Sequence, residues 1–168
     1  KYFDFMIDEN KKQNPEIKVV KKYVGIKNEV SLIDQQQHKI IYSINSEINL
    51  YGSKSEVYSA FINLLTNAIR YTDKEGEISV SWNKINNDAI FQVIDKGIGI
   101  PEEHVNRITE RFYRVDEDRS RESGGTGLGL SIVKNVMHQH QGEIRVASEL
   151  NSGSSFKLIF PTERILFK

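Results

Sequence analysis

Residues 124–133, Gly-Gly-Thr-Gly-Leu-Gly-Leu-Ser-Ile-Val, constrain the fold of this chain most, because alternating glycines lead directly into an apolar segment of helical character. Glycine has no Cβ, so Gly125, Gly127 and Gly129 can adopt positive φ and bring backbone N–H groups together around an anion. The helix that follows adds the positive end of its dipole. A tight turn needed only for packing would use the same residues. The segment therefore predicts either a phosphate-binding loop or a structural turn.

The overall composition limits the partners of the chain. Its 168 residues contain 23 Lys and Arg against 23 Asp and Glu, so no net charge favours nucleic acid, a membrane surface or acidic partners. The chain has no cysteine, which excludes disulfides and thiolate metal sites. No apolar run approaches the length needed to cross a bilayer. We therefore expect a monomeric soluble domain with a local anion site, without nucleic-acid binding or membrane contact of its own.

The order of the apolar patterns predicts an α+β fold. Residues 1–15 are expected to form an N-terminal segment or linker, and residues 16–168 one domain. Apolar spacings of three and four predict helices at 16–36, from an N-cap at Ser55 to about 72, and at 128–140. β-Rich runs are expected at 39–45, 48–51, 78–83, 89–94, 143–148 and 155–160. This alternation is typical of a two-layer α/β sandwich with its helices on one face.

The predicted second helix carries Asn63, Asn67 and Arg70 at spacings of four and three, so the three side chains project from one side. A carboxamide oxygen suits Mg²⁺, which prefers oxygen ligands. A guanidinium pairs with phosphate. Ordinary solvated helix residues would give the same pattern, so this helix alone leaves a metal and phosphate site and a plain polar face both open.

A carboxylate lies just before two glycines in Asp-Lys-Gly-Ile-Gly-Ile at 95–100, directly after an apolar strand. Asp95 can only accept hydrogen bonds, and in a pocket it could accept one from the exocyclic amino group of adenine. Gly97 and Gly99 would let the backbone approach the ring closely. Asp-Lys-Gly is also common turn chemistry, so a base-reading loop and a simple turn are both consistent with the pattern.

Residues 101–124 form a polar segment of interleaved arginines and acids that contains Thr-Glu-Arg-Phe-Tyr-Arg at 109–114. An aromatic pair can anchor a lid, and an arginine on that lid can meet a phosphate. Phe112 and Tyr113 could equally pin the loop to the core. The two interpretations can hold together.

These four features, in this order, resemble the ATP-binding catalytic domain of sensor histidine kinases, within the larger family of gyrase, Hsp90 and MutL. The matching segments are the asparagine box at 63–72, the first glycine box at 95–99, the phenylalanine box at 111–114 and the second glycine box at 125–129. The resemblance covers about 16–161. Glu-Arg-Phe-Tyr-Arg-Val-Asp at 110–116 and Phe-Pro-Thr-Glu-Arg-Ile-Leu at 160–166 are similar to the phosphate-regulon subgroup.

The resemblance implies a Bergerat-type fold, a mixed sheet covered by three helices, with ATP and Mg²⁺ bound between the second helix and an ATP lid at about 101–124. It implies that Asn67 binds Mg²⁺ with Asn63 in support, and that Arg70 contacts phosphate. Arg114 is expected to reach the γ-phosphate, which makes Arg114 and Asn63 the candidate catalytic residues. The remaining implied nucleotide contacts are Tyr71 at the base or ribose, Asp95 at the adenine amino group, Gly97, Gly99, Ile100 and Tyr113, and a phosphate cradle of Gly125, Thr126, Gly127, Leu128 and Gly129.

The partners implied by the resemblance lie outside this sequence. The receiving histidine is expected on a separate dimerisation domain of the same full-length kinase, in a His-Glu or His-Asp motif followed by proline. His38, His104, His138 and His140 are each followed by other residues. A response regulator is the next expected partner. The full-length protein is expected to be a bacterial inner-membrane protein with this domain in the cytoplasm, acting in phosphate-starvation signalling.

The hydrolysing relatives differ at one position. Gyrase and Hsp90 carry a water-activating glutamate one turn before the Mg²⁺-binding asparagine, where this chain has Asn63, and a carboxamide cannot act as a general base. We therefore expect Mg-ATP binding with little ATPase activity and no autophosphorylation. The alternatives are an ATPase of the gyrase, Hsp90 and MutL type, a non-catalytic nucleotide-binding adaptor module, and a serine kinase that acts on anti-sigma antagonists.

Overall fold

The computed structural model describes residues 16–17, 19–35, 37–45, 47–115 and 126–167. Its helices are α2 (Val19–Asp34), α3 (Lys54–Tyr71), α4 (Glu102–Val105) and α6 (Gly129–Gln139), with a 3₁₀ turn η1 (Thr162–Arg164). Its strands are β1 (Glu16–Ile17), β2 (Lys39–Ile44), β3 (Ile48–Tyr51), β4 (Glu77–Ile85), β5 (Asp88–Asp95), β6 (Glu143–Glu149), β7 (Gly153–Phe160) and β8 (Ile165–Phe167). The predicted segment 1–15 and the part of the expected lid at 116–124 lie outside the described residues.

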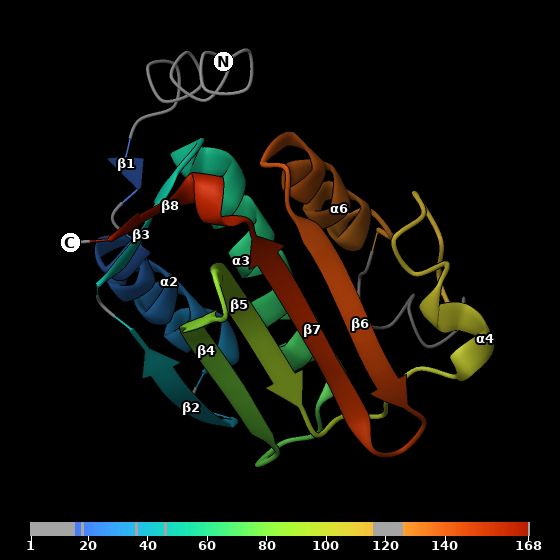
Figure 1. Ribbon diagram of the computed structural model, residues 1–168. Helices are drawn as coiled ribbons and strands as arrows, with labels where there is room; N and C mark the ends of the chain where they lie inside the picture. The colour runs from blue at the N-terminus through green and yellow to red at the C-terminus, as the bar shows by residue number, and fades with distance from the viewer. Residues whose placement is uncertain (1–15, 18, 36, 46, 116–125, 168) are drawn as a thin grey trace.

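Five strands form one mixed sheet in the order β2-β4-β5-β7-β6. Strand β2 runs parallel to β4, and the other neighbouring pairs are antiparallel. Helices α2, α3 and α6 all lie on one face of this sheet (Figure 1). The predicted α+β sandwich, a mixed sheet covered by three helices, is confirmed.

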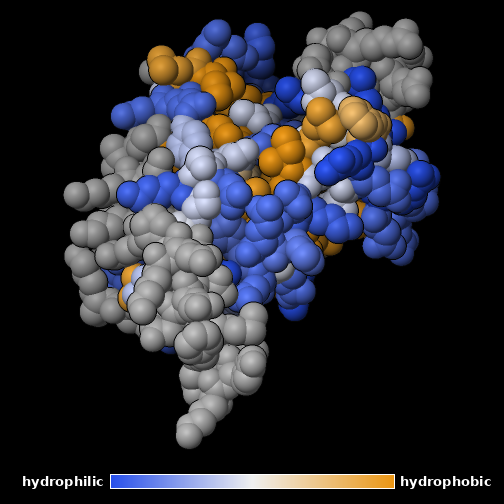
Figure 2. Space-filling view, turned by 90° about the horizontal axis from the view of Figure 1, so that it is seen from above, coloured by the Kyte–Doolittle hydropathy of each residue, from blue (hydrophilic) through white to orange (hydrophobic). Residues whose placement is uncertain are grey.

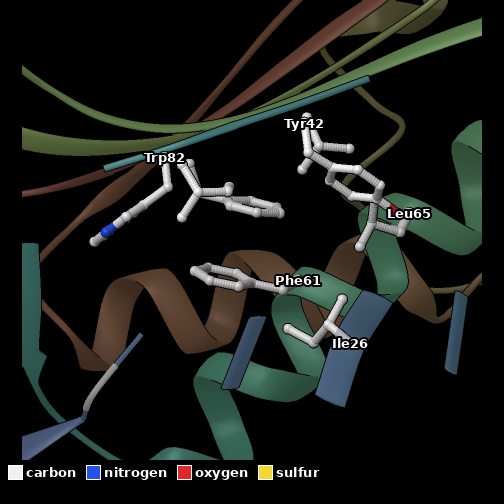
Figure 3. Close-up of a pocket in the computed structure, with 8 residues that line it drawn as sticks. Ile26, Tyr42, Phe61, Leu65 and Trp82 are labelled. Carbon is white, nitrogen blue, oxygen red and sulfur yellow. The ribbon is translucent and has the colours of Figure 1, made fainter. Parts of the chain in front are cut away.

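An aromatic cluster fills the space between the sheet and the helices. Phe61 of α3 stacks on Phe91 of β5, with 3.8 Å between the ring centroids, and Phe160 of β7 meets Phe61 edge-on. Figure 3 shows Trp82 and Tyr42 pointing from the strands toward the helices. The gap between these side chains measures about 10 Å³ and has an aromatic and aliphatic lining. It is a packing gap of about the size of one water, too small for a nucleotide.

A second, smaller sheet joins the two ends of the domain and was not predicted. Strand β3 pairs with β1 on one side and with β8 on the other. The predicted helix at 16–36 is therefore wrong at its start, because Glu16–Ile17 forms backbone pairs with β3 and the helix begins at Val19. The Trp82 indole N–H donates to Ile48 O at 3.1 Å and so links the two sheets.

The buried face of α2 ends on an acid and not on an apolar residue. Ile26 and Val30 are buried, but Ile33 is 45% exposed and Asp34 is buried instead. Successive inward positions on this helix are four residues apart, so the last one falls on an acid. That acid has a partner in the site described below.

Helix α3 begins two residues earlier than predicted. Its N-cap is Ser53, whose Oγ accepts a hydrogen bond from the Glu56 N–H at 3.5 Å, so the assignment of Ser55 as the cap was wrong. The backbone N–H of Ser53 donates to Nε2 of the buried His140 at 3.1 Å. Thr72 ends the helix as its C-cap, as predicted. The start of α3 is thus fixed in part by His140, the C-cap of α6.

The surface is mixed in character. In the view of Figure 2, hydrophilic side chains cover much of the visible face and hydrophobic ones form separate patches between them. Across the described ranges, we find no helix whose length and apolar character would let it span a membrane.

Candidate functional site

The polar face of α3 forms one side of the site. Asn63 and Asn67 are half-buried on this face, and Arg70 is exposed one turn further on. The Asn63 Nδ2 donates to Ser59 O at 2.8 Å, which fixes the carboxamide. Its Oδ1 points toward the start of α6, because a Cβ built on Gly129 would lie 2.7 Å from it. Gly129 is thus required for the close packing of α6 on α3.

Asp95 ends strand β5 and is 5% exposed. Its carboxylate accepts hydrogen bonds from the backbone N–H of Gly97, at 2.9 Å, and of Ser154. Burial raises the pKa of Asp95, and these two hydrogen bonds oppose the rise only in part. A buried carboxylate with this support is a hydrogen-bond acceptor held in a fixed direction.

The loop after Asp95 is attached to the end of α3. The Ile98 N–H donates to Tyr71 O at 3.1 Å, and a Cβ on Gly97 would lie 2.2 Å from the same carbonyl oxygen. The Tyr71 side chain is 41% exposed. The structure therefore brings the predicted base-reading acid, the predicted base-lining tyrosine and the asparagine helix together in one unit.

Gly99 and Ile100 belong to the same loop but face protein atoms. Gly99 has φ +67, and a Cβ there would lie 1.9 Å from Glu149 O at the end of β6. Ile100 is half-buried against the core, and its N–H donates to the Ser148 hydroxyl at 2.8 Å. The glycines of this loop thus permit close approach of protein backbone, which agrees with the simple turn that the sequence also left open. Their predicted contact with nucleotide stays a prediction.

The two aromatic residues of the expected lid behave differently. Tyr113 is half-buried, its hydroxyl lies 2.5 Å from His104 Nδ1 of α4, and the Arg107 guanidinium sits 4.3 Å from its ring centre. Phe112 has φ +63 and is 70% exposed. The interpretation that both rings pin the loop to the core therefore fails for Phe112, whose ring is largely exposed.

A buried guanidinium nitrogen lies just beyond these rings. Nη2 of Arg114 is shielded from solvent and has no hydrogen-bond partner among the described residues. A cationic donor without a partner is costly unless a ligand or ion completes it. The predicted phosphate-contacting arginine therefore has the chemistry that an anionic ligand fits.

The described part of the predicted phosphate cradle lies at the start of α6. Gly125 is outside the described residues, and Thr126 is exposed. Gly127 has φ +69 and packs against Phe112, whose N–H donates to Gly127 O at 2.9 Å. Leu128 is the N-cap and Gly129 the first residue of α6. Free N–H groups and the positive dipole end of a helix favour an anion here.

The described residues contain no group of three His, Cys, Asp or Glu side chains able to hold a metal. Mg²⁺ in nucleotide sites keeps several waters and takes few protein ligands beside the phosphates. A single carboxamide oxygen, from Asn67, is consistent with that mode of binding.

A buried ion pair that the sequence did not reveal supports the end of α3. The imidazole Nδ1 of His38 bonds to the Asp34 carboxylate, and its Nε2 lies 2.9 Å from Thr72 O. Both side chains are almost fully buried. Both partners are acceptors, so the two ring nitrogens donate only when the imidazole is protonated. Burial alone lowers the pKa of His38, but the hydrogen bonds to Asp34 and Thr72 and the Asp34 charge outweigh it, so the pKa is raised above 6.5.

This pair predicts a pH dependence of folding. The folded state holds the His38 proton more tightly than the unfolded state, so the stabilisation is fully present below pH 6.5 and is lost as the pH rises through the raised pKa. His38→Gln should lower the free energy of unfolding by about 1–3 kcal/mol at pH 6 and flatten its fall above pH 6.5. Urea titrations followed by Trp82 fluorescence measure this effect.

Two comparisons make the His38 test specific. The exposed His138 offers the matched control His138→Gln, which should leave the pH profile unchanged. Burial lowers the pKa of His140, so that histidine affects stability below pH 6.5 with the opposite sign. An unchanged slope above pH 6.5 in His38→Gln would contradict the assignment.

Comparison with known proteins agrees with this geometry. The sequence profile of the histidine kinase-, DNA gyrase B- and HSP90-like ATPases matches residues 52–164, which is more than half of the chain. The chain therefore belongs to this family, and the predicted family is confirmed.

Its curated relatives include sensor kinases. The chain is 37% identical over 144 residues to the phosphate regulon sensor protein PhoR of Haemophilus influenzae, covering 86% of this chain and 34% of the relative. It is 39% identical over 142 residues to PhoR of Pseudomonas aeruginosa, covering 84% and 32%. It is 42% identical over 127 residues to the histidine-protein kinase ArlS of Staphylococcus aureus, covering 76% and 28%. The chain thus spans about a third of the length of these relatives.

Solved structures share the fold. The mycobacterial sensor histidine kinase MprB superposes with a TM-score of 0.77 at 24% identity, over 88% of this chain and 97% of that one. Full-length ShkA in complex with AMPPNP superposes with a TM-score of 0.70 at 21% identity, over 85% of this chain and 30% of that one. At these identities the likeness concerns the fold, which is the predicted Bergerat-type sandwich.

Proposed function

We propose that this chain is the catalytic domain of a two-component sensor histidine kinase, which binds Mg-ATP and donates the γ-phosphoryl group to a histidine on a separate dimerisation domain. A response regulator would be the next acceptor. The observation that carries this proposal is the hydrogen bond from Ile98 N–H to Tyr71 O, which attaches the loop after the buried Asp95 to the end of α3. This attachment supports the proposal, because an acceptor suited to adenine would then lie beside a helix face suited to Mg²⁺ and phosphate.

In this proposal, each side of the site has a distinct task. Asn67 would hold Mg²⁺ with Asn63 in support, while Arg70 and Arg114 contact phosphate. Tyr71, Tyr113 and the loop of Gly97, Gly99 and Ile100 would enclose the base and ribose around Asp95. Residues 125–129 would receive the phosphates through backbone N–H groups at the start of α6. The unpartnered Nη2 of Arg114 supports the phosphate role most directly.

Phosphoryl transfer requires alignment and charge stabilisation more than covalent chemistry from the protein. Mg²⁺, when bound, would neutralise charge on the β- and γ-phosphates. The Arg114 guanidinium would stabilise charge on the γ-phosphoryl oxygens. A ring nitrogen of the acceptor histidine would form the new N–P bond as the bond from phosphorus to the β–γ bridging oxygen breaks, with ADP leaving.

Two features of the chain support transfer over hydrolysis. Asn63 is held by its hydrogen bond to Ser59 O, lies close to Gly129, and has no group that can take a proton from water. Three of the four histidines make side-chain hydrogen bonds within the fold, namely His38, His104 and His140. The fourth, His138, is exposed on α6. We infer slow ATP hydrolysis and no autophosphorylation by this chain.

The finer assignment rests on likeness to PhoR at 37–39% identity. We propose that the full-length protein is a bacterial inner-membrane sensor acting in phosphate-starvation signalling, with this domain in the cytoplasm. Residues 16–168 would form the monomeric catalytic domain, residues 101–124 its ATP lid, and residues 1–15 an N-terminal segment or linker.

The test mixes the purified chain, γ-labelled ATP and Mg²⁺ with separately expressed dimerisation domains from histidine kinases similar to this chain. We expect label on the histidine of the His-Glu or His-Asp motif of a cognate domain, with little release of free phosphate. Removal of Mg²⁺ by EDTA should abolish the transfer. Rapid release of phosphate without an acceptor would favour the gyrase-type ATPase. ATP binding without transfer to any of these domains would favour the adaptor module.

A further inference from the structure

The loop after Asp95 is held by backbone hydrogen bonds to several elements. The N–H groups of residues 96–98 donate to β4, to Asp95 itself and to α3. The Ile100 N–H instead donates to a side chain from outside the loop, the Ser148 hydroxyl in β6, at 2.8 Å. A strand distant in sequence therefore holds the far end of this loop through one hydroxyl group.

The hydrogen-bonding capacity of Ser148 is fully used. Its hydroxyl donates to Gly153 O at 2.9 Å and lies 2.8 Å from the Ser154 hydroxyl. A serine hydroxyl has one proton and two lone pairs. Since Ser148 accepts from Ile100 and donates to Gly153, its second lone pair accepts the Ser154 hydroxyl proton. An alanine at this position would release all three contacts at once.

Ser154 carries the connection on to the acid. It is 8% exposed, and its backbone N–H donates to the Asp95 carboxylate. The neighbouring Gly153 has φ +98, and a Cβ there would lie 2.0 Å from Asp95 O. The start of β7 is therefore packed against Asp95, and its position is set in part by Ser148.

We propose that Ser148 is a positioning residue for recognition of the purine base: its hydroxyl fixes Ile100 on one side and, through Ser154, the direction of the Asp95 carboxylate on the other. This inference rests on the proposed function, in which Asp95 accepts a hydrogen bond from the adenine amino group. Ser148 itself does not touch the base. Its effect should therefore depend on whether the ligand has that amino group.

The test compares two ligands on the 168-residue chain by equilibrium binding: ATP and purine riboside triphosphate, which lacks the 6-amino group. Ser148→Ala should weaken ATP binding about tenfold, as expected for a displaced charge-assisted hydrogen bond, and the analogue by less than about twofold. Ser148→Thr keeps a hydroxyl and should restore most of the preference for ATP. Ser155→Ala is the matched control, because Ser155 bonds to Gln92 on the opposite face of the sheet.

The outcomes separate this inference from the proposed function. If the wild-type chain binds neither ligand, or binds both equally, base recognition by Asp95 fails. If the wild type prefers ATP and Ser148→Ala weakens both ligands by the same factor, Ser148 is merely structural and the inference is overturned. If Trp82 fluorescence shows that Ser148→Ala is unfolded, Ser154→Ala provides the same comparison, since it leaves the bonds of Ser148 to Ile100 and Gly153 intact.

Discussion

Asp95→Asn is expected to weaken ATP binding by about thirtyfold to a hundredfold, which corresponds to the loss of a charge-assisted hydrogen bond of about 2–3 kcal/mol. Asparagine has the same shape, and its Oδ1 can still accept the Gly97 N–H that bonds to Asp95 at 2.9 Å. Its amide group would then present a donor to the amino group of adenine, itself a donor. Isothermal titration calorimetry with ATP measures the change.

Asp88→Asn, at the other end of β5, is the matched control and should bind ATP normally. Acidification supplies an independent check. Because burial raises the pKa of Asp95 above 3.8, ATP affinity should decline as the pH falls toward that raised pKa. The decline should begin at a higher pH than it would for an aspartate with the ordinary pKa. Unchanged ATP affinity in Asp95→Asn would show that the base is read elsewhere.

Asn67→Ala is expected to reduce phosphoryl transfer to a cognate dimerisation domain by about a hundredfold or more, comparable to the loss of one preorganised group that stabilises the transition state. The carboxamide lies on the α3 face one turn from Asn63, whose own carboxamide is fixed by its hydrogen bond to Ser59 O. Alanine is a strong helix former, so α3 should keep its structure. Single-turnover transfer from γ-labelled ATP gives the rate.

Binding measurements separate metal from nucleotide in this variant. Without Mg²⁺, ADP should bind Asn67→Ala and the wild type alike, because the base contacts are intact. Asn83→Ala, on β4, should transfer at the wild-type rate. Full transfer activity in Asn67→Ala would refute the proposed metal role.

The parts of the fold that follow from local pattern could be predicted. Helix α3 has its apolar residues at regular helical spacing, so its existence and inward face were evident from the sequence. Asp95 was identifiable because a strand of buried residues ends at it. The cap at Ser53 was missed although a signal was present, since Glu56 three residues later gives the Ser-x-x-Glu pattern of a capping box.

The parts that depend on distant partners could not be predicted. Strand β1 is two residues long and exists because β3 offers it a free edge. Nothing in the sequence distinguishes Ser148 from the other serines, because its contact with Ile100 arises only in the folded chain. The burial of His38 follows from α2 and α3 meeting at Asp34 and Thr72. In each case the contact joins residues that no local sequence pattern connects.

The hydrogen bond between Phe112 and Gly127 has a consequence for how the sequence of such a domain can change. Both residues have left-handed backbone, and their hydrogen bond fixes the two points between which the intervening sequence runs. The entropy of closing a flexible loop grows only with the logarithm of its length, at about 0.6 kcal/mol for each doubling. Insertions or deletions between these two residues should therefore be tolerated without breaking the contact of Phe112 with Gly127, so the number of intervening residues can change while α4 and α6 stay in place.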